Sequence, residues 1–182
     1  MTNLTEIHNT MLISPNKVKN YETVNLNVSD SQIGNAIRIS QSVYLTDILG
    51  TELVEKMQEL VYNKIKGSGE TIDDSGNTQY KDLLELYVTP VLVYRTAVEL
   101  CSTLTLKIRN MGVVKNNDTN VQSTTAGDVK YMKEYYETFF YDAVNKMMDF
   151  LCKNKTAFVE LPDGFCTCKR KPLYARTSLW LG

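Results

Sequence analysis

The chain has 182 residues, 43% of them hydrophobic, and a formal net charge of −1. This length suits one domain with flanking segments. The near-neutral charge argues against a protein that binds nucleic acid through its overall charge, because phosphate binding needs a concentrated basic surface. No stretch approaches the ~18 consecutive apolar residues of a membrane span, and the N-terminus lacks the charged and apolar regions of a secretory signal. The composition therefore predicts an ordinary globular protein without a membrane segment, made in a cytoplasm.

Residues 1–28 are predicted to form an N-terminal arm. Leu4, Ile7 and Met11 are spaced for a short helical turn. Pro15 is predicted to stop that turn, since proline disfavours a helical conformation in the residue before it. The asparagine-rich stretch that follows, at 21–28, is typical of extended chain.

A first long helix is predicted to begin at Ser29, because Ser29 and Gln32 have the spacing of a capping box. Apolar residues at three- and four-residue spacing carry this helix to Gly50, which is expected to end it. Thr51 is then expected to cap a second helix, and Gly67 to end that one. The polar stretch after it is predicted to be a flexible loop.

The third helix is predicted to run over 78–109 with Pro90 inside it, where the missing backbone hydrogen bond should cause a kink. A polar loop is predicted at 113–127. The fourth helix is predicted over 126–153 from an unbroken helical period. Together the pattern predicts an all-α fold with a four-helix bundle-like core at 29–154.

Aromatic and apolar residues on the third and fourth helices exceed what one packed stripe needs. We predict that some of them form a contact between subunits, since tyrosine is favoured at interfaces as well as in cores. The alternative is a core with partly exposed tyrosines. The candidates for the interface are Tyr87, Tyr94, Tyr135 and Phe139.

The sequence offers little that resembles a catalytic or ligand-binding site. His8 has no obvious partner, and the stretch 67–70 lacks the Gly-Lys-Ser/Thr ending of a phosphate loop. Asp73, Ser75 and Asn77 have the alternate spacing of a calcium loop, but the required glycine and closing glutamate are absent. We therefore predict no catalytic residue, no cofactor and no metal.

The four cysteines are predicted to be reduced thiols, because nothing indicates export. Cys101 and Cys152 lie at positions predicted to be packed in helices. Cys166 and Cys168 form a Cys-Thr-Cys sequence that lacks the further ligands of a structural zinc site.

Residues 155–182 are predicted to be an irregular, basic C-terminal arm that docks on another chain. Its apolar aromatic end is costly to leave in water, so it is expected to pack against something. The alternative is that Trp180 caps the subunit's own bundle. The residues predicted to dock are Lys169, Arg170, Lys171, Tyr174, Arg176, Leu179, Trp180 and Leu181.

The order of these parts resembles the head-to-tail adaptor (connector, or ring) proteins of tailed phages, of the kind found in crAss-like and related Bacteroidetes phages. The likeness covers about residues 28–154. The stretches that carry it are the capped entry at 28–33, the helix–glycine–helix joint at 48–53, the stretches 83–94 and 109–114, and the end of the aromatic fourth helix at 150–154.

The resemblance implies a non-enzymatic virion protein at the neck of the phage. It further implies that copies of the chain form a ring, usually of twelve subunits in such adaptors, beneath the portal protein. The ring extends the DNA channel without sequence-specific DNA binding and supports the next tail or ring protein. Two other functions remain open: a monomeric helical regulator or inhibitor that binds one partner through the C-terminal arm, and a small intracellular enzyme with an unfamiliar site.

Overall fold

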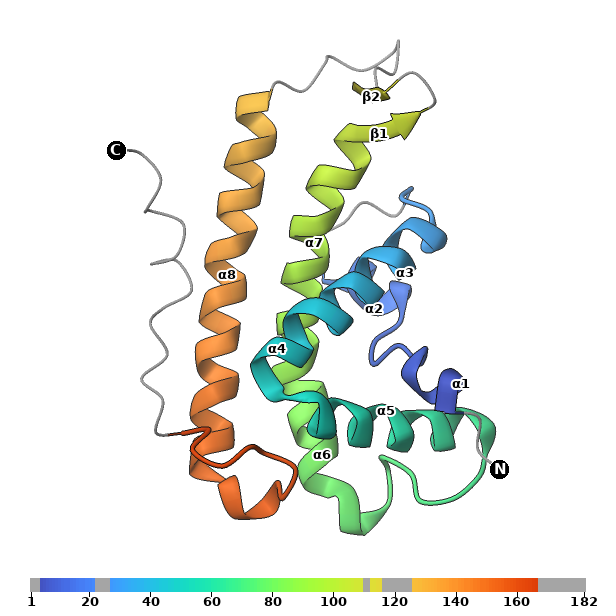
Figure 1. Ribbon diagram of the computed structural model, residues 1–182, viewed down its shortest axis with the longest axis vertical. Helices are drawn as coiled ribbons and strands as arrows, with labels where there is room; N and C mark the ends of the chain where they lie inside the picture. Colours follow the sequence, from blue (N-terminus) through green and yellow to red (C-terminus); the bar gives the residue numbers. More distant parts are fainter. Residues whose placement is uncertain (1–3, 22–26, 110–111, 116–125, 167–182) are drawn as a thin grey trace.

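The computed structural model describes residues 4–21, 27–109, 112–115 and 126–166. These residues have an all-α fold, as predicted, with one short hairpin at the end of a long helix. Figure 1 shows two long helices, α7 (Thr89–Thr105) and α8 (Ala126–Lys153), standing side by side, with the earlier helices packed along one side and across the base of α7. Within the described residues, no helix combines the length and the apolarity needed to cross a membrane.

The first predicted helix is confirmed, but it consists of three consecutive helical segments. The side chain of Ser29 accepts a hydrogen bond from the backbone N–H of Gln32, as the capping box predicts. α3 (Asp30–Ile39) continues through a π-helical turn, η1 (Ser40–Leu45), into α4 (Thr46–Leu49). Gly50, at φ 86°, then ends the run.

The second predicted helix is α5 (Thr51–Lys66), and Gly67 ends it in the left-handed conformation, as predicted. The predicted cap is wrong: Thr51 is the first helical residue, Gly50 takes the capping position, and no side-chain cap bond forms. The reason is the positive φ of Gly50, which breaks the chain direction one residue earlier. The polar stretch that follows buries Ile72 and includes a 3-10 turn, η2 (Ser75–Asn77).

The third predicted helix is α6 (Thr78–Asp82), a second π-helical turn η3 (Leu83–Val88), and α7. The π turn ends at Val88, two residues before Pro90, where a kink was expected. A proline ring crowds the preceding turn and has no N–H to donate. The wider π turn relieves this crowding. Thr89 stabilises the turn, because its backbone N–H and its hydroxyl both donate to the carbonyl oxygen of Leu84.

The prediction that this helix extends to residue 109 is wrong. α7 ends at Thr105, and β1 (Leu106–Arg109) pairs antiparallel with β2 (Gly112–Lys115), with Leu106 opposite Lys115. Apolar and basic residues alternate through β1, which is a strand pattern. Ile108 also lies four residues after Leu104, which is a helical spacing, and that ambiguity explains the error. The fourth predicted helix is confirmed with the same bounds, as α8.

The N-terminal segment is not an arm over its described residues. α1 (Leu4–His8) and α2 (Pro15–Asn20) pack on the bundle, and Leu12, Ile13 and Val18 are buried in the main core. Pro15 begins α2 instead of only ending a turn. It occupies the first helical position after the Ser14 cap, where proline is well tolerated.

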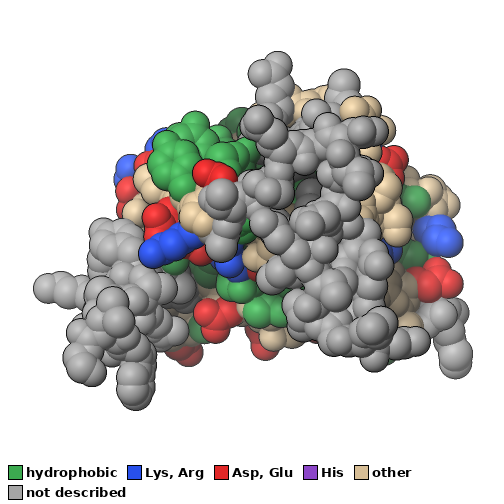
Figure 2. All heavy atoms as spheres, turned by 90° about the horizontal axis from the view of Figure 1, so that it is seen from above, with side chains coloured by type: hydrophobic (Ala, Val, Ile, Leu, Met, Phe, Trp, Pro, Cys, Tyr) green, Lys and Arg blue, Asp and Glu red, His purple; other side chains and the backbone are tan. Residues whose placement is uncertain are grey.

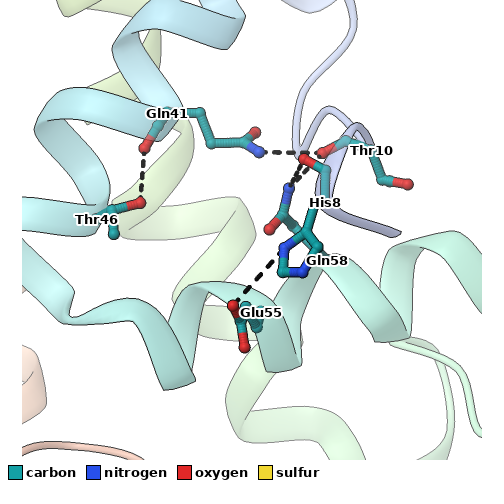
Figure 3. Close-up of polar contacts among 6 residues, drawn as sticks. All are labelled: His8, Thr10, Gln41, Thr46, Glu55 and Gln58. Carbon is teal, nitrogen blue, oxygen red and sulfur yellow. Dashed lines mark hydrogen bonds and ion pairs between the residues drawn. The ribbon is translucent and has the colours of Figure 1, made fainter. Parts of the chain in front are cut away.

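Two buried glutamines hold this N-terminal segment by its backbone (Figure 3). Gln41 accepts from the backbone N–H of Leu12 at 2.9 Å. It also donates to the carbonyl oxygen of Thr10 at 3.0 Å, a bond drawn in Figure 3. Gln58 donates to the carbonyl oxygens of His8, at 2.8 Å, and Thr10, at 3.0 Å. These bonds satisfy backbone groups that no regular element would pair.

Residues 155–166 also pack on the bundle, so the predicted arm does not begin at 155. Phe158, Leu161 and Phe165 are buried in the core, after the short turn η4 (Lys155–Ala157). The thiol prediction is wrong for one pair: a disulfide joins Cys152 and Cys166, with their Cα atoms 5.5 Å apart, and both residues are exposed. The apolar residues of the segment fold it back on the base of α8, which brings the two cysteines together. Cys168 lies outside the described residues.

Candidate subunit interface

Aromatic side chains form a row along the α7–α8 pair. The rings of Tyr94 and Phe139 stack with centroids 5.4 Å apart, and Tyr135 meets Phe139 edge-on at 4.9 Å. Lower on the pair, Tyr87 stacks on Phe150 at 4.2 Å. The structure therefore brings the predicted interface residues of both helices onto one side of the pair.

The four predicted residues differ in exposure. Tyr135 and Phe139 are 47% and 38% exposed, whereas Tyr87 and Tyr94 are half-buried and pack against the core. The first two can be covered by a partner without unfolding the subunit. Tyr94 packs beneath Phe139, and Tyr87 packs on Phe150 lower on the pair.

A hollow of about 280 Å³ lies on this side of the pair. It is lined by residues of both helices and by Tyr21, which follows α2. Its polar edge is formed by Asp142 and Lys146, whose charged groups are 2.6 Å apart. The hydrogen bond to Asp142 raises the pKa of Lys146, so its ammonium group stays charged at neutral pH.

Sequence analysis missed several exposed residues on this side. Leu86 is 63% exposed and lines the hollow, and Tyr131 is 67% exposed one turn before Tyr135. The sequence signal that could have found them is that each is apolar or aromatic but lies outside the stripe of residues that faces the core.

We define the aromatic face as Tyr21, Leu86, Tyr87, Tyr94, Tyr131, Tyr135 and Phe139. Figure 2 looks down on the end where α8 begins, and hydrophobic side chains gather there at one side of the visible surface.

A buried arginine fixes α8 against α7. The Arg95 guanidinium lies over the Tyr44 ring at 3.5 Å, pairs with Glu99 on α7, and lies 4.0 Å from Glu137 on α8. A cation desolvated between an aromatic ring and carboxylates is held firmly. The network therefore ties η1, α7 and α8 together and gives the aromatic face a rigid support.

Burial also sets the titration of two tyrosines beside the face. It raises the pKa of Tyr136 and of Tyr141, and for Tyr141 the nearby Glu137 adds to the effect. Both phenols are therefore neutral donors at physiological pH. Among the described residues, no group of three or more His, Cys, Asp or Glu side chains is placed to hold a metal ion.

The structure does not test the predicted docking residues, which begin at Lys169 and end at Leu181, because they lie outside the described residues. The residues that could suggest a site elsewhere have structural contacts. His8 lies 3.6 Å from a carboxylate oxygen of Glu55, and Asp73 forms ion pairs with Lys64 and Lys81.

Comparison with known proteins identifies a family but no function. No curated protein and no solved structure matches the chain. Residues 45–171 match the profile of a family of unknown function, DUF6712. The match spans most of the bundle, including α5, the α7–α8 pair and the segment tied back by the disulfide. The chain therefore belongs to the DUF6712 family.

Proposed function

We propose that this chain is a structural subunit that assembles side by side with copies of itself, and that it is a head-to-tail adaptor forming a ring in the neck of a tailed phage. In this proposal the ring lies beneath the portal protein and carries the next tail component. Its work is assembly and support, without catalysis.

The observation that carries the proposal is the aromatic face. Large aromatic side chains exposed together on a rigid helix pair mark a surface for protein contact. Tyr131, Tyr135 and Phe139 recur at four-residue spacing along α8, so one partner surface can cover all three. The order of helices and joints seen in the sequence, which resembles phage adaptors, supplies the kind of assembly.

The test is the mass of the particle for the full-length protein and for a double variant, Tyr135→Asp with Phe139→Asp. We expect the unaltered chain to form one large species and the double variant to remain a folded single subunit. A buried aspartate without a partner strongly disfavours a contact, and aromatic anchors commonly contribute at least ~2 kcal/mol each.

The matched control is Val43→Asp with Val159→Asp. It adds the same charge at two exposed residues, 56% and 84% exposed, that are not among the residues of the aromatic face. Circular dichroism checks that each variant keeps its helices. If the aspartates at 135 and 139 leave assembly unchanged, the aromatic face is not the subunit contact.

A further inference from the structure

A groove opens at the base of the molecule on the side away from α8. It is lined by the chain that joins α1 to α2, the last turns of α5, and α6 with η3, and its volume is about 720 Å³. That size can take a few large side chains. Its apolar lining includes Met11, Ile13, Val61, Ile65, Ile72 and Leu84. Ile65 is 68% exposed, so a partner would bury apolar surface that the subunit leaves open.

The charged side chains at the rim of this groove form ion pairs with one another. Lys64 and Lys81 share Asp73, at 2.7 and 3.0 Å, and Lys66 lies 3.6 Å from Glu6. A ligand therefore gains little by bringing an anion to these lysines.

One face of α5 leads to the groove and is acidic. Glu52, Glu55 and Glu59 stand at three- and four-residue spacing, which places them in a row, and the row continues to Tyr62 at the groove wall. A basic extended chain would follow this row, and an apolar end would fit the groove beyond it.

We propose that the groove binds residues 167–182 of a second copy of this chain. This segment carries four basic residues, Lys169, Arg170, Lys171 and Arg176, followed by the apolar end Leu179, Trp180 and Leu181. The order of charge and then apolar residues matches the acidic row and then the groove. The inference rests on the proposed function, since it assumes that copies assemble.

The position of the chain's exit favours a second copy over the same copy. The disulfide fixes Cys166 to Cys152 in the last turn of α8, whereas the groove lies beside α1 and the end of α5, on the opposite side of the base (Figure 1). A head-to-tail ring contact needs two different patches on opposite sides of the subunit. The 16 residues after Cys166 can extend roughly 50 Å, enough to reach a neighbour.

The test is a photo-crosslink from the end of the segment in the full-length chain. Trp180→p-benzoylphenylalanine keeps an aromatic ring at that position and reacts with whatever lies against it. Chains with normal and heavy nitrogen are mixed, assembled and irradiated, and the linked peptides are identified by mass. We expect links to residues 5–14 or 61–66 that join a normal chain to a heavy one. The same probe in place of Val159, which is 84% exposed, is the control for random contact.

A variant in the groove tests whether the crosslink depends on the apolar wall of the groove. Ile65→Glu places a charge at the groove wall and is expected to reduce the crosslink about tenfold, which corresponds to about 1.4 kcal/mol. The matched variant Val43→Glu, at another exposed aliphatic position, should leave the yield unchanged. Links within one chain only, or links outside the groove, overturn the inference.

The mass of the same sample separates this failure from failure of the proposed function. Large assemblies without a groove crosslink would reject only the docking of the segment in the groove. A species with the mass of one subunit would reject both.

Discussion

At the residue scale, buried polar side chains decide where the N-terminal segment packs. Gln41 is 5% and Gln58 4% exposed, and each bonds to backbone groups more than 25 residues away in the sequence. An apolar residue at either position would bury equally well but would leave backbone groups unpaired. Glutamine is therefore needed for its hydrogen bonds: Gln41 both accepts and donates, and Gln58 donates to two carbonyl oxygens.

Gln58→Leu is expected to lower the free energy of unfolding by about 1–3 kcal/mol, because the carbonyl oxygen of His8 loses the amide donor of Gln58 and that of Thr10 keeps only the donor from Gln41. Urea unfolding measures the change. Gln79→Leu, at a half-buried position of α6, is the control and should cost less. Equal losses in the two variants would mean that the amide bonds do not hold the segment.

Tyr80 provides a test in alkaline solution. Its hydroxyl donates to the carboxylate of Glu160 at 2.8 Å, and burial, with this bond, raises the pKa of Tyr80 to about 12. Because the unfolded value is near 10, the stability that Tyr80 contributes is complete below pH 10 and is lost as the pH rises towards 12. Tyr80→Phe should therefore show a smaller fall in unfolding free energy between pH 10 and 12 than the unaltered protein. Parallel curves for the two proteins over that range would contradict this.

At the element scale, the two long helical runs that lead into the bundle are each interrupted by a π turn that ends before a threonine. Thr46 and Thr89 each donate from the backbone N–H and from the hydroxyl to the carbonyl five residues earlier. Such a doubled bond stabilises the wider turn, which is rare in helices and common at functional sites. η3 contributes Leu86 and Tyr87 to the aromatic face, so its geometry positions part of the proposed interface.

Thr89→Val is expected to cost about 1 kcal/mol of unfolding free energy, because it removes one buried hydrogen bond with little change of shape. The control is Thr103→Val, in the same helix, where the hydroxyl bonds an ordinary carbonyl four residues earlier and is exposed. Chemical unfolding compares the two. A Thr89→Val protein as stable as the parent would show that the backbone bond alone holds the π turn.

The disulfide that closes the 152–166 loop gives a second test of an element. Reduction is expected to lower the unfolding free energy by roughly 2–4 kcal/mol, since the bond restricts the unfolded chain. The double variant Cys152→Ser with Cys166→Ser should be equally unstable with or without reductant. If reductant leaves the unaltered protein unchanged, the bond does not stabilise the segment.

The sequence predicted the elements whose signal is local and repeated. The Ser29 cap, the stop at Gly67 and the whole of α8 follow from capping chemistry and period. It did not predict features that depend on distant partners. The burial of Val18 depends on the bundle beneath it, and the Cys152–Cys166 bond depends on a fold-back driven by Phe158 and Phe165.

The candidate interface was predicted only in part, because it too depends on contacts between residues far apart in the sequence. An excess of apolar positions could be counted from the sequence, and it led to Tyr135 and Phe139. Which aromatic residues stay exposed depends on how α7 and α8 are rotated against each other, and the buried Arg95 network sets that rotation. Leu86 was missed because it lies outside the apolar stripe that runs through Leu83, Tyr87 and Val91.

At the scale of the whole molecule, the subunit offers two apolar surfaces in different places. The aromatic face lies on the α7–α8 pair, and the groove lies at the base beside α1 and the end of α5. A closed ring of identical subunits needs unlike patches that meet, and arms that order on assembly strengthen such contacts.

The measurement that tests this account most directly is the particle mass of the purified full-length protein over a range of concentrations. The account predicts one closed species whose mass is a whole-number multiple of 20.7 kDa and well above a dimer. A protein that stays at 20.7 kDa at every concentration, with its helices intact and its aromatic face unaltered, would contradict it.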